Sequence, residues 1–361
     1  MHKRLFIPGP VDVLPEVLDK MTTPMIGHRT KDISALQERI SEKLKRVMRT
    51  NNTILLSSSS GSGLMEGAVR CFTQERAAVF SVGAFGDRWY KMCTANSVPA
   101  DLFRSDPGEP TTPEMVRQAL ATGKYDMITI TQNETSTGIR NPMREIHEVL
   151  SDYPDVILCV DAVSSMGGDD IPVDELGIDV CITSTQKCLG LPPGMSVASV
   201  SDRAIKKAER IPNRGLYFDY VELYKFVKEK PYQYPSTPSI PHMFALDYQL
   251  DRILKEGLAA RYERHLALSS LVWEWGKKNC ALFSNPTYLS VTVTCLKNTF
   301  GMDFSKINAA MGQRGFQLSN GYGALKDITF RIAHMADMTV EEMKNMLKNL
   351  DEVITELKNG D

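Results

Sequence analysis

Asp179-Val180-Cys181-Ile182-Thr183-Ser184-Thr185-Gln186-Lys187 is an apolar strand pattern that ends in a lysine, and runs of this kind decide the fold. Similar apolar runs occur at Thr53–Ser58, Ala77–Val82, Met127–Gln132, Val156–Asp161 and Met195–Val200. Helical patterns separate several of them, at Gly63–Thr73, Thr112–Ala121 and Pro142–Ser151. Strands that are apolar throughout and are separated by helices indicate a mostly parallel sheet covered on both faces. The sequence therefore predicts an α/β protein.

The repeating pattern stops near residue 203, and the rest of the chain predicts a second, smaller unit. A chain of 361 residues is too long for one ordinary core but suits a large domain plus a small one. The last hundred residues are typical of an α+β domain, with strands near 288–295 and 327–332 and helices near 303–313 and 339–358. We expect an N-terminal arm (1–15), a large domain (16–257) and a small C-terminal α+β domain (258–361).

Composition and charge exclude several classes of function. The formal net charge is −2, so no overall field attracts nucleic acid or an anionic membrane. We find no apolar run of transmembrane length, and the first apolar stretch is too short for a secretory signal. The seven cysteines form no CxxC pair and no cluster with zinc spacing, so no metal site is expected. A reduced, cytoplasmic compartment is the prediction.

The Ser57–Gly63 segment is a candidate anion site because it follows a strand and opens a helix. Glycines there let backbone N–H groups approach an anion, and a helix N-terminus favours negative charge. The segment is no Walker A loop, since no Gly-Lys-Ser/Thr follows, and it is a poor match to the dinucleotide-binding pattern. A phosphate site and a plain Ser/Gly turn that caps a core helix both remain open on this evidence.

Two strand ends carry residues suited to cofactor chemistry. Asp161 ends an apolar run, where it is either a turn or cap residue or a carboxylate that holds a cofactor ring nitrogen protonated. Lys187 ends another, where it is either an ordinary loop lysine or an amine that loses its proton and attacks a carbonyl.

These features, in this order, resemble the class V aminotransferases of pyridoxal 5'-phosphate (PLP) fold type I. The similarity is greatest to the alanine–glyoxylate and serine–pyruvate branch. Three further motifs carry it: Pro8-Gly9-Pro10, Asn133-Glu134-Thr135-Ser136-Thr137-Gly138, and Pro192-Pro193-Gly194 after Lys187. The resemblance covers nearly the whole chain and implies a PLP fold type I large domain with a mostly parallel sheet, plus a smaller C-terminal domain.

The resemblance also implies a role for individual residues. Lys187 would carry PLP as a Schiff base and move the substrate proton, and Asp161 would pair with the ring nitrogen. Arg331 would bind the substrate carboxylate, which suits a bidentate guanidinium. Phe85 would stack on the ring and Thr135 would bond near its O3′. The phosphate would be held by Ser60, Gly61, Ser62 and Gln186, and by Tyr234 and Thr237 from the neighbouring subunit, so a homodimer with shared active sites is implied.

The sequence departs from the family at two of these positions. Ser62 stands where animal members have His, and Phe85 where Trp is common. Neither change removes the chemistry, because backbone N–H groups hold most of a phosphate and phenylalanine still stacks. His28 and Arg29 either read a substrate side chain or are solvated, and Cys188, beside the lysine, is interpreted as structural.

The predicted function is a PLP-dependent transamination. The amino donor would be a small amino acid, alanine or serine, and the acceptor a small 2-oxo acid, glyoxylate or pyruvate. Alternatives are another class V activity, namely aspartate, phosphonate or ureidoglycine transamination, or a lyase. A nucleotide-dependent reductase is disfavoured because no acidic residue follows the second strand. A non-catalytic protein that kept the fold is a third possibility, against which Lys187, Asp161 and Arg331 argue.

Overall fold

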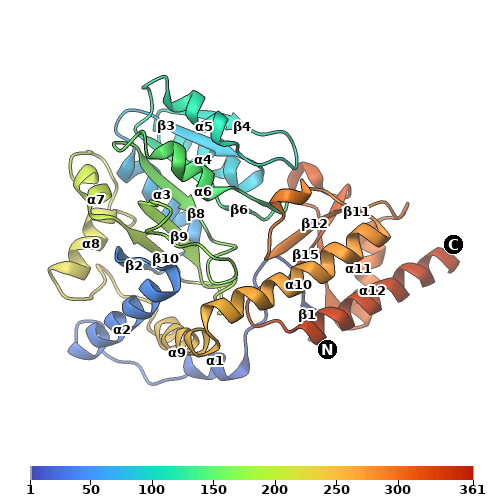
Figure 1. The fold of residues 1–361 in the computed structure, drawn as a ribbon. Coiled ribbons are helices and arrows are strands. Elements are labelled where there is room, and N and C mark those ends of the chain that lie inside the picture. Colours follow the sequence, from blue (N-terminus) through green and yellow to red (C-terminus); the bar gives the residue numbers. More distant parts are fainter. Residues whose placement is uncertain (1, 361) are drawn as a thin grey trace.

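A seven-stranded sheet forms the centre of the larger part of the molecule (Figure 1). The computed structural model describes residues 2–360. In spatial order the strands are β2 (Thr53–Ser57), β10 (Ser196–Val200), β9 (Val180–Ser184), β8 (Ile157–Asp161), β5 (Met127–Thr131), β3 (Ala77–Ser81) and β4 (Ala100–Arg104). Only β10 is antiparallel to its neighbours, so the other six strands run the same way. The predicted mostly parallel sheet is confirmed.

Side chains alternate between two apolar cores along each strand. In β3, Ala78 and Phe80 face one core while Ala77 and Val79 face the other, because successive residues point to opposite faces. The first core is closed by α1 (Pro15–Lys20), α2 (Lys31–Met48), α5 (Pro113–Leu120), α6 (Met143–Leu150) and α9 (Ile240–Glu256). The second is closed by α3 (Gly61–Phe72), α4 (Ala84–Ala95), α7 (Asp202–Ala208) and α8 (Tyr220–Lys228).

The strand β4 is absent from the runs recognised in the sequence. It is an edge strand whose residues are half-buried, and it carries Asp101 and Arg104. An edge strand needs less apolar surface than a central one, which explains why no continuous apolar run marks it.

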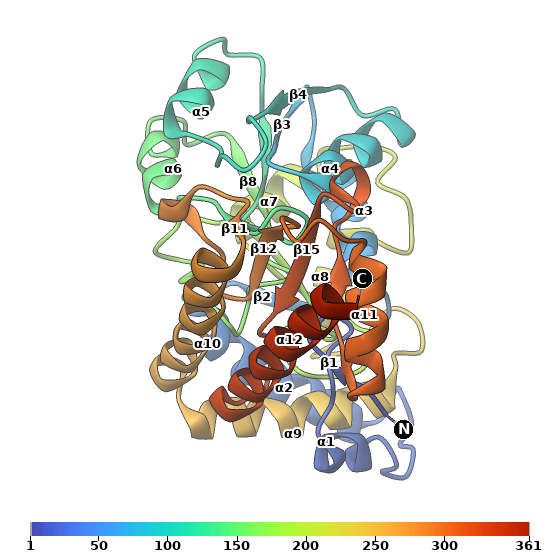
Figure 2. The same ribbon diagram turned by 90° about the vertical axis from the view of Figure 1, so that its right-hand side faces the viewer.

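The smaller part has its own antiparallel sheet and helical layer (Figure 2). Its strands are β11 (Ala281–Leu282), β12 (Val293–Lys297), β15 (Thr329–Ala333) and β14 (Ser319–Asn320). Its helices are α10 (Leu258–Asn279), α11 (Phe304–Gln313) and α12 (Val340–Gly360), with short 3-10 turns η1 (Pro286–Tyr288) and η2 (Gly323–Leu325). Apolar side chains of these elements form a separate core with Phe6. The domain limits at 15 and 257 stay predictions.

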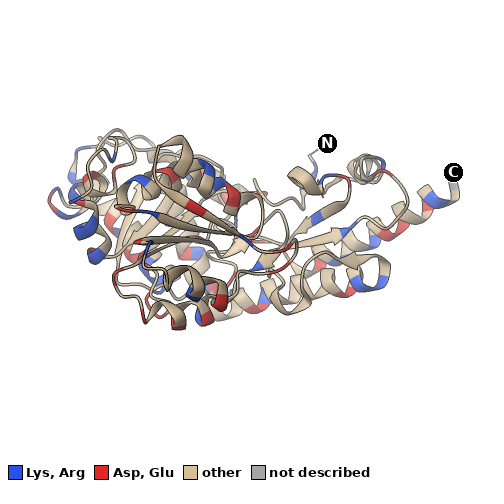
Figure 3. Cartoon of the chain, turned by 90° about the horizontal axis from the view of Figure 1, so that it is seen from above, with Lys and Arg blue, Asp and Glu red and all other residues tan. Residues whose placement is uncertain are grey.

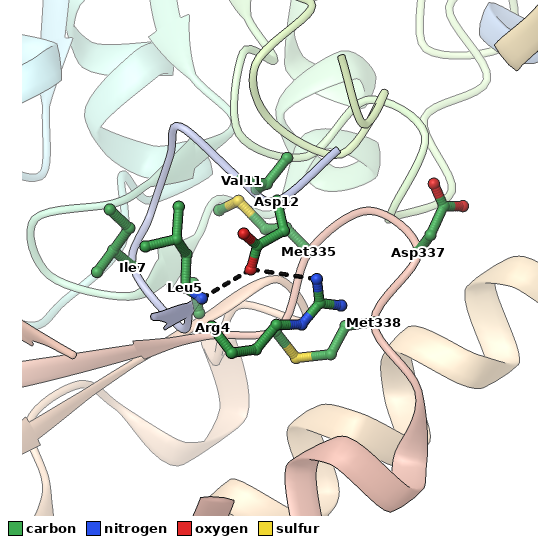
Figure 4. Close-up of a pocket in the computed structure, with 9 residues that line it drawn as sticks. Arg4, Leu5, Ile7, Val11, Asp12, Met335, Asp337 and Met338 are labelled. Carbon is green, nitrogen blue, oxygen red and sulfur yellow. Dashed lines mark hydrogen bonds and ion pairs between the residues drawn. The ribbon is translucent and has the colours of Figure 1, made fainter. Parts of the chain in front are cut away.

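The N-terminal arm joins the two parts. Its β1 (Arg4–Leu5) pairs with β13 (Phe316–Gln317) of the smaller part. Asp12 then folds the arm back, because its carboxylate accepts a bond from the Leu5 N–H at 2.7 Å and pairs with Arg4 at 3.1 Å (Figure 4). The cavity beside this contact measures about 10 Å³, enough for one water at most, so it is no substrate site.

Charged residues of both signs are spread over both parts of the chain (Figure 3). Within residues 2–360, no helix combines the length and the apolar character needed to cross a membrane. The seven cysteines are free thiols, and six of them are buried.

Candidate active site

The ends of the parallel strands bring the predicted site residues to one edge of the sheet. Asp161 is the last residue of β8, Lys187 follows β9, and Gly61 lies shortly after β2. Phe85 lies in the first turn of α4 after β3, and Thr135 follows the short strand β6 (Asn133–Glu134), which pairs with β7 (Ile139–Arg140). Ligands of open α/β sheets bind beyond such carboxyl ends.

The N-terminus of α3 has unbonded N–H groups and no side chain at Gly61, so an anion can come close to the backbone. The carbonyl of Ser60 accepts the Gly63 N–H at 2.9 Å, and the first-turn N–H groups of Gly61 and Ser62 have no acceptor within the helix. A Cβ at Gly61 would lie 2.7 Å from Val163 Cγ2 and 2.8 Å from Ser184 Oγ, so only glycine permits this close approach. Exposed N–H groups at a helix N-terminus are suited to a phosphate.

Lys187 lies under the N-terminal arm. Its Nζ donates to the carbonyl of Pro8, and the Val11 N–H donates to the carbonyl of Gln186 at 3.2 Å. Gly9 has a φ of +85°, and a Cβ there would lie 2.6 Å from Lys187 Cδ. The Pro8-Gly9-Pro10 motif therefore covers the lysine.

The surroundings of Lys187 favour its neutral form. Burial lowers the pKa of its amine to about 8, with a further lowering by the charges of Arg331 and Arg88 and opposing contributions from Cys188 and Asp161. A neutral amine is the form that attacks a carbonyl or accepts a proton. The same interactions show that Arg331, Arg88 and Asp161 share one site with Lys187.

Asp161 is nearly enclosed, with 4% of its surface exposed. One carboxylate oxygen accepts the Val163 N–H at 2.8 Å. Burial raises its pKa to about 6, and the charge of Glu134 adds to this, while the Val163 N–H, Arg88 and Lys187 oppose it. A cation placed against this carboxylate would stabilise its ionised form.

Glu134 fixes the start of α4 and with it Phe85. Its buried carboxylate accepts the N–H groups of Phe85 and Gly86 at 2.9 and 3.0 Å, and the Ser136 hydroxyl at 2.6 Å. A negative charge at a helix N-terminus is favourable. The Phe85 ring also has the guanidinium of Arg88 over it, at 4.6 Å from the ring centroid. Arg88 donates to Ser62 Oγ at 3.1 Å.

Arg331 links the two parts of the chain and keeps donors free. Its Nε and Nη2 donate to the carbonyl of Asn320, both at 3.1 Å, and its Nη1 donates to that of Thr135 at 3.2 Å. A guanidinium has five N–H groups, so two remain, one on each terminal nitrogen, without an acceptor in residues 2–360. This pair of donors matches a carboxylate.

Tyr234 and Thr237 lie at the edge of the site. The Tyr234 hydroxyl accepts the N–H of Ser58 of the same chain at 3.3 Å, whereas Thr237 is exposed. Arg29 donates to the carbonyls of Tyr234 and Pro235 and so positions this segment. The role of both residues at a neighbouring subunit's phosphate stays a prediction.

Two buried polar atoms at the site lack a partner among the described residues. They are Ser184 Oγ, in the last residue of β9, and Gln186 Oε1, in the residue before Lys187. A bound ligand could satisfy them, since buried polar atoms are normally hydrogen-bonded.

Cys188 is poorly suited to chemistry. It is fully buried, its Sγ donates to the carbonyl of Ser164 at 3.3 Å, and burial raises the pKa of the thiol to about 12. Reactive cysteines have low pKa values. Within residues 2–360, no group of three or more His, Cys, Asp or Glu residues is placed to bind a metal ion.

Sequence reasoning missed the functional placement of four residues. No contact in the site was predicted from the sequence for Gly9, Glu134, Arg88 or Tyr322. Gly9 and Glu134 lie within recognised motifs, but nothing in the sequence shows which side chain each motif contacts. Tyr322, whose ring lies 5.6 Å from that of Phe85, belongs to a loop without any pattern.

Comparisons with known proteins identify the family of the chain. The family model for aminotransferase class-V matches residues 17–275. An uncharacterised aminotransferase of Methanocaldococcus jannaschii is 37% identical over 99% of this chain and 94% of its own length. The serine–glyoxylate aminotransferase of Arabidopsis thaliana is 30% identical over 98% and 90%.

A solved structure has the same fold over nearly the whole chain. The alanine–glyoxylate aminotransferase of a Nostoc species superposes with a TM-score of 0.92 at 27% identity, covering 98% of this chain and 96% of that one. The fold matches PLP fold type I, as predicted. The chain belongs to the class-V aminotransferases and is a PLP-dependent transferase.

Proposed function

We propose that this enzyme transfers the amino group of a small amino acid, alanine or serine, to a small 2-oxo acid, glyoxylate or pyruvate. The observation that carries the proposal is Arg331, which offers two free N–H groups within electrostatic reach of Lys187. A carboxylate bound there brings its Cα close to the lysine. We further propose a cytoplasmic homodimer.

The residues present fit PLP part by part. The Gly61 cradle and the first-turn N–H groups of α3 would hold the phosphate, with Ser60, Ser62 and Gln186 beside them. Asp161 would face the ring nitrogen, whose positive charge offsets the cost of a buried carboxylate. Phe85 would stack on the ring, and Thr135 would bond near its O3′.

Each protein group has a defined task in the reaction. Bound PLP supplies the electron sink that stabilises charge at Cα. Lys187, with its lowered pKa, accepts the Cα proton and returns it. Arg331 fixes the substrate by its carboxylate and so orients the Cα–H bond. Asp161 keeps the ring nitrogen protonated.

A donor with one carboxylate fits the cations of the site best. An aspartate donor needs a second cation, and the nearby candidates are Arg88 and Arg29. Arg88 is engaged with Ser62 and Phe85, and Arg29 with backbone carbonyls of the Tyr234 segment. The names of the Arabidopsis and Nostoc relatives, with serine and alanine as donors, support the same choice.

The homodimer rests on the exposed Thr237 and its neighbour Tyr234. Tyr234 and Ser239, on either side of Thr237 in the chain, both bond to Ser58. Thr237 is exposed and has no hydrogen-bond partner among the described residues, which leaves its hydroxyl available to a second subunit.

The test is the absorbance spectrum of the purified enzyme after single amino acids are added in turn. We expect the visible band of the bound cofactor to bleach with alanine or serine and to return when glyoxylate or pyruvate follows. Aspartate at the same concentration serves as the comparison. Faster bleaching by aspartate than by alanine and serine would contradict the proposed donor class.

A further inference from the structure

Tyr322 lies between the substrate-binding arginine and the aromatic side chain of the cofactor site. Its ring stacks on Phe85, with centroids 5.6 Å apart and planes inclined by 25°. On the same ring, the guanidinium carbon of Arg331 lies 5.4 Å from the centroid. Tyr322 comes from the loop after β14 and Phe85 from α4, so the contact also bridges the two parts of the chain.

If Arg331 binds the substrate carboxylate, its position determines which side chains of the protein lie beside the substrate's Cα. A carboxylate that accepts the two free N–H groups of Arg331 sits about 3 Å from its terminal nitrogens. The Tyr322 ring lies against the same guanidinium and so borders the space in which the atoms next to the bound carboxylate would lie. Those atoms are Cα and the first side-chain carbon of an amino acid.

The Tyr322 ring borders an open cleft. A cleft of about 370 Å³ is lined by residues of α4, of the β6–β7 hairpin and of the loop that carries Tyr322, among them Gly83, Ala84, Ser136, Thr137 and Leu325. The cleft is mostly apolar, and it would hold a side chain of several carbons. Tyr322 is one wall of it and stands between it and Arg331.

Tyr322 is suited to block part of the substrate space with its ring rather than to hydrogen-bond a substrate. It is 41% exposed, and its hydroxyl makes no hydrogen bond to another residue of the described chain. Its ring stacks on Phe85 and faces Arg331, which is itself fixed to the carbonyls of Asn320 and Thr135.

We propose that Tyr322 is a specificity-determining residue that limits the amino donor to side chains of the size of alanine or serine by closing off this cleft. The inference rests on the proposed function and names the residue behind its preference for small donors. It predicts that removal of the ring admits longer unbranched side chains, whereas removal of the hydroxyl alone changes nothing.

The experiment compares wild type, Tyr322→Ala and Tyr322→Phe as holoenzymes. Bleaching of the cofactor band is followed with alanine, 2-aminobutyrate and norvaline, and the concentration for half-maximal amplitude is measured beside the rate. We expect Tyr322→Ala to raise the norvaline-to-alanine rate ratio about tenfold or more, since one methylene in an apolar pocket is worth about 10- to 200-fold. Tyr322→Phe should keep the wild-type ratio.

The outcomes separate this inference from the proposed function. If wild type responds to no small amino acid, the proposed function fails. If wild type responds to alanine but Tyr322→Ala keeps the wild-type ratio, the proposed function stands and Tyr322 is no specificity wall. The ratio of two substrates on one protein is insensitive to a loss of folded enzyme. Ile328→Ala, an exposed apolar residue (60%) before β15, is the control for a general effect of truncation, and a shifted ratio there would also overturn the inference.

Discussion

Three charged side chains carry the proposed chemistry, and burial shifts the pKa of each. Lys187 is held towards its neutral form, Asp161 has a raised pKa, and Arg331 keeps two donors free. The sequence predicted Asp161 and Lys187 at strand ends, and the family resemblance pointed to Arg331. It could not predict their pKa values, because these depend on which charges meet across the fold.

Asp161 is expected to destabilise the protein without its cofactor at neutral pH. Its pKa of about 6 in the folded state lies above the ordinary value of 3.8, so folding favours the protonated form. The resulting stability is fully present below pH 3.8 and is lost as the pH rises through 6. At pH 7.5 the apoprotein of Asp161→Asn should therefore be more stable than wild type by about 1–3 kcal/mol.

Denaturant unfolding of both apoproteins at pH 7.5 and at pH 4.5 measures this difference. We expect it to shrink at the lower pH, while Asp161→Asn loses most transaminase activity because the ring nitrogen is no longer held protonated. An Asn variant that is less stable than wild type at both pH values would show that the carboxylate contributes stability instead.

At the scale of elements, apolar runs identified the strands that are buried along their whole length, including the edge strand β2, and missed a half-buried one. The six recognised runs all form strands of the large sheet, whereas β4 was missed because it is half-buried. Farther along the chain, two helices, α9 and α10, meet at Gly257. A glycine with a φ of +86° ends the first helix, which periodicity alone does not reveal.

The N-terminal arm is the element whose role the sequence left unexplained. We predict that Gly9→Ala lowers cofactor affinity and activity at least tenfold, because the added Cβ would lie 2.6 Å from Lys187 Cδ and 2.8 Å from its Nζ. Titration of the apoprotein with PLP, followed by absorbance, measures the affinity.

Gly257→Ala is the matched control for Gly9→Ala. Gly257 has nearly the same φ, +86° against +85°, but a Cβ there would meet nothing within 4 Å. Both variants carry the backbone strain of a left-handed residue, and only Gly9→Ala adds the contact with Lys187. Equal losses in cofactor affinity would mean that backbone strain, and not the contact with Lys187, causes the effect of Gly9→Ala.

At the scale of the whole molecule, one buried arginine joins the smaller part to the loop that contains Lys187 and Cys188. Arg261 of α10 is fully buried and donates to the carbonyls of Gly167 at 2.7 Å and Cys188 at 2.8 Å. It also pairs with Glu256 and Asp337, at 2.7 and 3.2 Å. In the sequence it is one of several arginines in a helical pattern, and such residues are usually solvated.

Arg261→Ala should lower the free energy of unfolding by about 3–5 kcal/mol, because two carboxylates and two carbonyls lose their partner. Arg117→Ala is the control, since Arg117 forms an exposed pair with Glu114 and should change stability by less than about 0.5 kcal/mol. Thermal unfolding of both variants measures the difference. A similar small effect for Arg261 would show that the two parts are joined by other contacts.

The most direct test of the account is to identify the residue that carries the cofactor. The holoenzyme is reduced with borohydride, digested, and analysed by mass spectrometry. We predict that the mass of the reduced cofactor lies on Lys187 alone and that Lys187→Ala carries no label and shows no visible band that bleaches with alanine. A label on another lysine, or full turnover by Lys187→Ala, would contradict the central claim.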